Sequence, residues 1–104
     1  MDKNFLKCVP SIEQAKIEKR FYARIYIPYS LTAWYVMGAD DVCGDCKLFV
    51  VEKRFNWIFG LLKLNAKIVR LSELERDFDN LEVEQFGVSK YSFDVFEHIN
   101  GLNE

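Results

Sequence analysis

Apolar residues stand at every second position early in the chain, at Phe21, Ala23, Ile25 and Ile27. This period of two is typical of a β-strand with one buried face. Pro28 ends the strand because proline has no N–H to donate to a ladder. Further β-prone runs predict strands from Leu31 to Met37, ended by Gly38 and an acidic loop, and from Cys46 to Glu52. The short links between these strands favour antiparallel pairing.

The second half of the chain continues this pattern less regularly. We predict a turn from Arg54 to Asn56, a strand over 57–64 interrupted near Gly60, another from Lys67 to Leu71, and a brief edge strand from Phe86 to Val88. The apolar run over 57–64 also fits a buried helix, because periodicity alone does not separate the two in short runs.

Helix-start signals occur at two serines. Ser11, with Gln14 three residues later, predicts a capped helix from Ile12 to Lys19. Ser72-Glu73-Leu74-Glu75 is a capping-box sequence and predicts a helix from Glu73 to about Asn80. After Ser92, helical spacing of apolar residues predicts a last helix, which Asn100-Gly101 ends: Phe93, Phe96 and Ile99. The elements together predict a single α+β domain over 1–104, a small antiparallel β-sheet with two or three short helices packed on it.

Composition limits the function. Half of the residues are apolar, which supports a folded core. The formal charge is −2, whereas nucleic-acid-binding domains usually carry a basic face, so direct nucleic-acid binding is not expected. The acidic stretch from Glu73 to Glu84 instead favours a protein partner with a basic surface. No apolar run reaches membrane-spanning length and no signal peptide is recognisable, which predicts a cytoplasmic protein without membrane association.

The cysteines carry the one candidate chemical motif, Cys43-Gly44-Asp45-Cys46. With Cys8 and His98, its two thiols would supply the four ligands of a zinc site. Redox catalysis needs the motif at a helix N-terminus, whereas a strand follows here. Two reduced thiols at a tight hairpin, with Gly44 and Asp45 supplying the turn, is the commoner arrangement.

Other chemistry is sparse. The acidic set Asp40, Asp41 and Asp45 lacks the spacing of a calcium loop and fits a solvated hairpin tip. The single histidine, His98, has no serine or cysteine partner nearby in the sequence. We therefore expect a protein that is not an enzyme and holds no cofactor.

Aromatic residues are frequent, at 15% of the chain. We expect about half of those between Tyr22 and Trp57 to pack in the core. Exposed ones on an open sheet could stack on single-stranded bases, but that function needs a basic groove. Tyr and Trp are also typical anchors of protein interfaces, and we predict this role for Tyr29, Trp34 and Trp57.

The order of these motifs resembles a family of small bacterial proteins of unknown function. The similarity covers about residues 21–95 and has five parts: the strand 25–27 with Pro28, Trp34-Tyr35, the acidic Asp40-Asp41, Leu48-Phe49-Val50, and the helix start Leu71-Ser72-Glu73-Leu74-Glu75. Cys43, Cys46 and the insert around Trp57 to Asn65 depart from the pattern. Such proteins belong to phages, conjugative plasmids and integrative elements. The resemblance implies an accessory binding protein, of a kind that includes inhibitors of restriction or CRISPR nucleases.

Three hypotheses follow. The first is a phage or mobile-element protein of anti-CRISPR or anti-restriction type, which inhibits a host nuclease or ribonucleoprotein complex by protein–protein contact. Its contact residues would be the three anchors above and the acidic residues Glu73, Glu75, Asp77 and Asp79. The alternatives are a zinc-stabilised or thiol-active module, with Cys8, Cys43, Cys46 and His98 as ligands, and a sheet that binds single-stranded nucleic acid. An edge strand also makes a homodimer possible.

Overall fold

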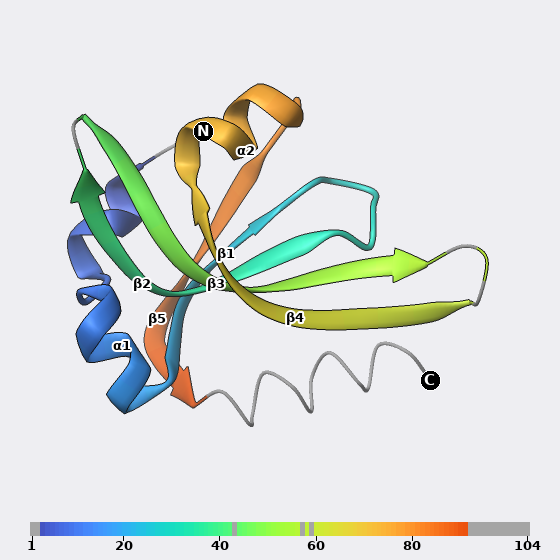
Figure 1. The fold of residues 1–104 in the computed structure, drawn as a ribbon. Coiled ribbons are helices and arrows are strands. Elements are labelled where there is room, and N and C mark those ends of the chain that lie inside the picture. Colours follow the sequence, from blue (N-terminus) through green and yellow to red (C-terminus); the bar gives the residue numbers. More distant parts are fainter. Residues whose placement is uncertain (1–2, 43, 57, 59, 92–104) are drawn as a thin grey trace.

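The described residues fold into a five-stranded antiparallel sheet with helices on both faces (Figure 1). The computed structural model describes residues 3–42, 44–56, 58 and 60–91. In chain order its elements are η1 (Asn4–Cys8), α1 (Ile12–Glu18), β1 (Arg20–Tyr26), β2 (Ala33–Val42), β3 (Asp45–Asn56), β4 (Leu61–Arg70), α2 (Leu71–Asp77) and β5 (Glu82–Tyr91). The strand order is β4-β3-β2-β1-β5, and every neighbouring pair is antiparallel. The predicted α+β class is confirmed, with two α-helices in the part of the chain that the structure describes.

Helix α1 begins where the sequence predicts it. The Ser11 hydroxyl accepts a hydrogen bond from the backbone N–H of Gln14 at 3.2 Å, which satisfies one of the free amides of the first turn. Ile12 and Ala15 are buried against the sheet, and the helix ends at Lys19 in the left-handed conformation. The predicted capped helix is confirmed, with its last residue at Glu18 and not Lys19.

Strand β2 runs five residues past the predicted end at Met37. Gly38 does not end it but lies beside a shift in register, where α1 comes close to the strand. Asp40, expected in a loop, pairs with Lys47 across the strands, and its carboxylate accepts from the N–H of Ile12 at 3.2 Å. The acidic residues therefore extend the hairpin. The start of α1 supplies Asp40 with a hydrogen-bond donor, which the sequence pattern does not reveal.

The β3–β4 hairpin also differs from the prediction. Arg54 to Asn56 continue β3 and do not form a turn. Leu61 to Arg70 form one unbroken strand, each residue of which pairs with β3, in place of two strands. Gly60 precedes it with a positive φ of 62°, so the predicted interruption is the hairpin connection itself. Trp57 and Phe59 lie outside the described residues.

Two apolar layers enclose the sheet. On the first side, which we call the α2 face, Trp34, Val36, Leu48 and Val50 pack with Phe5 of η1 and with two leucines of α2, Leu71 and Leu74. On the other side, the α1 face, Tyr35, Met37 and Val51 pack with Ala15 of α1. Because both faces are covered, β2 is buried at six consecutive positions from Ala33 to Gly38.

The last two described elements shift relative to their predicted bounds. Helix α2 begins at Leu71 and not at Glu73, and β5 spans Glu82 to Tyr91 where Phe86 to Val88 was predicted. The prediction of β5 as an edge strand is confirmed. The predicted helix around Phe93, Phe96 and Ile99 lies outside the described residues. No helix in the described ranges has the length and apolarity needed to cross a membrane.

Candidate binding surface at the hairpin and helix α2

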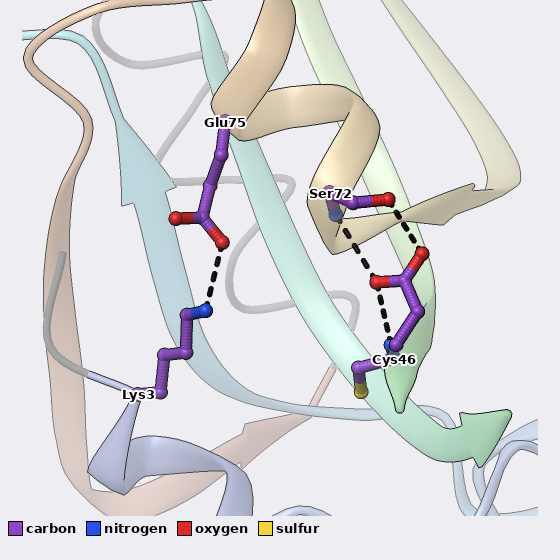
Figure 2. Close-up of polar contacts among 5 residues, drawn as sticks. Lys3, Cys46, Ser72 and Glu75 are labelled. Atoms are coloured by element: carbon purple, nitrogen blue, oxygen red, sulfur yellow. Dashed lines mark hydrogen bonds and ion pairs between the residues drawn. The ribbon is translucent and has the colours of Figure 1, made fainter. Parts of the chain in front are cut away.

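Asp45 fastens the tip of the β2–β3 hairpin to the start of α2. Its Oδ2 accepts from the Ser72 hydroxyl, and its Oδ1 accepts from the backbone N–H groups of Ser72 at 3.2 Å and Cys46 at 2.8 Å (Figure 2). The Ser72 hydroxyl, followed by the Cys46 amide, lowers the pKa of Asp45, so the carboxylate is ionised at neutral pH. An ionised group with three donors holds two segments together that lie 27 positions apart.

This arrangement corrects the predicted capping box. Ser72 lies inside the helix, and the N-cap position belongs to Arg70, which makes no side-chain cap hydrogen bond. In a capping box the Ser72 hydroxyl would accept a hydrogen bond from the backbone N–H of Glu75. Here Asp45, from the hairpin, is the acceptor for a free N–H of the first turn, that of Ser72. Glu75 instead pairs with Lys3 at 3.0 Å (Figure 2). Sequence spacing identified the helix start but not its partner.

An open cleft of about 620 Å³ lies between the hairpin tip, η1 and α2. Leu6, Cys46 and Leu71 contribute apolar or weakly polar surface, while Asp41, Asp45, Ser72, Glu75 and Lys3 contribute polar surface. Lys3 is the one cation among these lining residues, and Glu75 already engages it. The cleft thus combines an apolar surface with a mainly acidic one.

Cys46 is buried, with 6% of its surface exposed. Burial, reinforced by Asp41, Asp45 and Asp40, raises the pKa of its thiol, which keeps the sulfur protonated at neutral pH. Its Sγ contacts the Lys47 carbonyl oxygen at 3.7 Å. A nucleophilic or redox thiol requires the opposite shift, so the thiol-active alternative finds no support at Cys46.

The predicted zinc ligands are only partly described. Cys8 is an exposed free thiol at the end of η1 and Cys46 a buried one in β3, whereas Cys43 and His98 lie outside the described residues. Within the described ranges no three Cys, His, Asp or Glu side chains are grouped to hold a metal. The hairpin reading of the motif needs one correction, because Asp45 pairs with Val42 as the first residue of β3 and Gly44, with φ of 81°, makes the turn.

The acidic residues predicted for partner binding are all exposed. Glu73, Glu75 and Asp77 belong to α2, and Asp79 follows it. Asp77 pairs with Arg76 at 2.9 Å, and this hydrogen bond lowers the pKa of Asp77. Glu73 and Asp79 have no ion-pair partner among the described residues. With Asp41 on the hairpin, the structure places carboxylates from two separate segments on one side of the sheet.

Tyr29 is fully exposed at the tip of the β1–β2 loop. Its φ of 62° is left-handed, a conformation that residues with a large side chain adopt at a cost. The loop is held by the Ser30 hydroxyl, which donates to the Ile27 carbonyl at 2.8 Å and accepts from the N–H of Thr32 at 3.2 Å. The predicted exposure of Tyr29 is therefore confirmed, and half-exposed Leu31 lies beside it in the sequence.

Trp34 is wrongly predicted as an exposed anchor. Its side chain is fully buried on the α2 face, where its Nε1 donates to Glu52 Oε2 at 2.8 Å and its ring lies 5.0 Å from that of Phe78. Trp34 and Glu52 are opposite each other across β2 and β3. The register that pairs them was not visible in the sequence. Trp57, the third predicted anchor, lies outside the described residues.

Comparison of the chain with protein-family models, curated proteins and solved structures finds no match. The resemblance to proteins of phages and mobile elements therefore stays a prediction.

Proposed function

We propose that this chain is a non-enzymatic binding protein whose α2 side contacts a basic surface of a partner protein. One observation carries the proposal: the Asp45–Ser72 hydrogen bonds bring the acidic hairpin tip against the acidic helix. Asp41, Glu73, Asp77 and Asp79 are then all exposed along this side. Glu73 and Asp79 form no ion pair with the described residues, and such carboxylates favour encounter with a positively charged partner.

The other end of α2 adds the aromatic anchor. Phe78 and Leu81, which follow the helix, pack in the same core layer as Ile27, at the start of the loop that presents Tyr29. Figure 1 accordingly shows α2 between the β2–β3 hairpin tip and the β1–β2 loop. Tyr29, exposed in this loop, would supply the apolar contact that interface hot spots require.

The partner we propose is the nucleic-acid-binding surface of a host defence nuclease, of the CRISPR or restriction type. Such surfaces are basic because they bind phosphates, and a row of carboxylates competes for the same contacts. The cleft would take an arginine or lysine side chain, whose apolar stem would lie on Leu6 and Leu71 while its charged end meets Asp41. The motif resemblance supports this choice of partner.

The test compares two double variants with the same change in net charge. Glu73→Gln with Asp79→Asn removes two carboxylates of the proposed surface that form no ion pair with the described residues. Glu13→Gln with Glu18→Gln removes two exposed carboxylates of α1, on the other side of the sheet. Each protein is expressed in bacteria that carry an active CRISPR or restriction system, and the plating efficiency of a sensitive phage is measured.

We expect wild type and the α1 variant to raise plating efficiency, and the α2 variant to lose at least tenfold of that gain. A third variant, Tyr29→Ala, should lose protection with its net charge unchanged. Equal protection by all variants would remove the proposed surface. Absence of protection by the wild type across defence systems would remove the proposed class of partner.

A further inference from the structure

The outer edge of β4 is open in the part of the chain that the structure describes. Among the described strands, β4 stands at one margin of the sheet and pairs only with β3 (Figure 1). The pairing continues from Leu61 to Arg70 without a shift in register. In an antiparallel edge strand, alternate residues direct their N–H and C=O groups away from the sheet. This strand thus presents a long, regular row of backbone donors and acceptors.

The usual protections of an edge strand are weak here. Edge strands are commonly short, bulged, or interrupted by proline, and β4 has none of these features. A lysine can also block pairing, but Lys67 turns onto the sheet face, where its Nζ contacts Glu52 Oε2 at 2.9 Å. Lys63 and Arg70 remain exposed, without an ion pair in the described ranges. The edge can therefore accept a further strand.

The positive charge of β4 and of the neighbouring β3 favours an acidic partner strand. Between residues 47 and 70 there are six basic residues (Lys47, Lys53, Arg54, Lys63, Lys67, Arg70) and one carboxylate, Glu52. Glu52 is already engaged by Arg54 at 3.1 Å as well as by Lys67. A second copy of β4 would bring like charges together, whereas an acidic strand would neutralise them.

The two sides of β4 differ in chemistry, with lysines on one and mainly apolar side chains on the other. By register, Lys63 and Lys67 share the α2 face with Glu52, while Ala66 and the half-exposed Ile68 lie on the α1 face. Because side chains alternate along a strand, a partner strand meets both sets when its acidic and apolar residues alternate. We infer that the β4 edge binds an extended acidic segment of a partner protein by β-strand addition, with acidic side chains beside Lys63 and Lys67 and apolar ones beside Ile68.

The probe is a fluorescent eight-residue peptide of alternating Glu and Val, and its binding to the full chain is measured by fluorescence anisotropy. We expect saturable binding that Lys63→Glu weakens at least fivefold. Lys16→Glu, the same charge change at an exposed position of α1, should leave the affinity within twofold. Two further peptides carry N-methyl groups at alternate amides, one at the amides of the Glu residues and the other at those of the Val residues. One of the two should bind at least fivefold more weakly than the other, because only one set of amides faces β4.

Three results would overturn this inference. Equal affinity of both N-methylated peptides would exclude strand addition. Equal affinity for a peptide of the same composition in blocks, or for single-stranded DNA of the same charge, would reduce the edge to a non-specific basic patch. Self-association of the chain in sedimentation experiments, abolished by an excess of the acidic peptide, would identify a second copy as the occupant. The proposed α2 surface takes no part in these outcomes.

Discussion

At the scale of single residues, two buried charges behave in opposite ways. Glu52 is buried but receives hydrogen bonds from Trp34 and Lys67 and an ion pair from Arg54. Burial acts to raise the pKa of Glu52, yet these partners outweigh it and lower the pKa below its ordinary value of 4.5. Lys53 is buried on the α1 face, with 4% of its surface exposed against 8% for Glu52, and none of the described residues forms an ion pair with it.

Replacement of Glu52 by Gln should destabilise the fold by about 2 kcal/mol at pH 7, because Lys67 and Arg54 lose their counter-charge. The stabilisation is full above the unfolded pKa of about 4.5 and is lost as pH falls through the lower folded pKa. Urea denaturation at pH 7 and pH 3 should show a smaller pH dependence for the variant. An equal pH dependence in both proteins would contradict the assignment.

Replacement of Lys53 by Met should stabilise the protein by about 1 kcal/mol. Burial, followed by repulsion from Arg24, lowers the pKa of Lys53, which means that the charged form is disfavoured in the fold. The gain should be full at neutral pH and shrink as pH rises toward the unfolded value of 10.5. Thermal melting is the measurement, with Lys63→Met as the exposed control, expected to change little. A lower melting temperature for Lys53→Met would refute the argument.

At the scale of elements, each helix is positioned by one local feature: α1 by its close approach to β2, and α2 by a single carboxylate. Helix α1 crosses β2 at Gly38, where a Cβ atom would lie 2.6 Å from Ala15 Cβ and 3.0 Å from Ile12 Cα. The glycine is needed for lack of space and not for its backbone conformation. Helix α2 depends on Asp45, which holds its first turn from the hairpin tip.

Gly38→Ala should destabilise the protein by about 1–3 kcal/mol, because the new methyl group forces α1 away from the strand. Ala15→Gly in the same chain should restore part of this loss, although glycine in a helix itself costs about 1 kcal/mol. Denaturation of the two single variants and the double variant measures the coupling. Strictly additive losses would show that the two residues do not compete for space.

Asp45→Ala should loosen α2 from the hairpin without unfolding the sheet. The N–H of Ser72 loses its acceptor, so its hydrogen exchange should accelerate, while exchange within β2 and β3 stays slow. Asp41→Ala is the control, because Asp41 is exposed and makes no hydrogen bond to α2 in the described residues. Unchanged exchange at Ser72 would show that the helix holds its position without Asp45.

At the scale of the whole molecule, the small net charge hides a separation of charge. The chain from residue 72 to 84 contains six carboxylates and one basic residue, whereas the β3–β4 hairpin is basic. The acidic set lies on α2, which packs over one face, and on β5, at the margin opposite β4. The molecule therefore offers surfaces of both signs, each suited to a partner of opposite charge.

Because charge attraction between exposed groups is screened by salt, the effect of the acidic variant should depend on ionic strength. Inhibition of a purified defence nuclease by wild type should weaken between about 0.05 and 0.5 M NaCl, as the Debye length shortens. The variant Glu73→Gln with Asp79→Asn should be weak at both, and the α1 control should follow wild type. Salt-independent inhibition would instead point to an apolar contact centred on Tyr29.

Local signals in the sequence determined the element types, because they depend on a few neighbouring residues. The alternation in β1, the Ser11 cap, the break in the strand pattern near Gly60 and the α+β class all follow from period, glycine and capping chemistry, although the turn itself was placed wrongly at Arg54 to Asn56. The exposure of Tyr29 and of the acidic residues on α2 was predicted from their residue types.

Only the tertiary structure decided what depends on distant partners. The burial of Trp34 follows from its register with Glu52, the full length of β2 from contact with α1, and the fixing of α2 from Asp45. Likewise, the edge position of β4 is set by strand order. These contacts join residues far apart in the chain, where burial and hydrogen bonding outweigh local preference, so no pattern along the sequence encodes them.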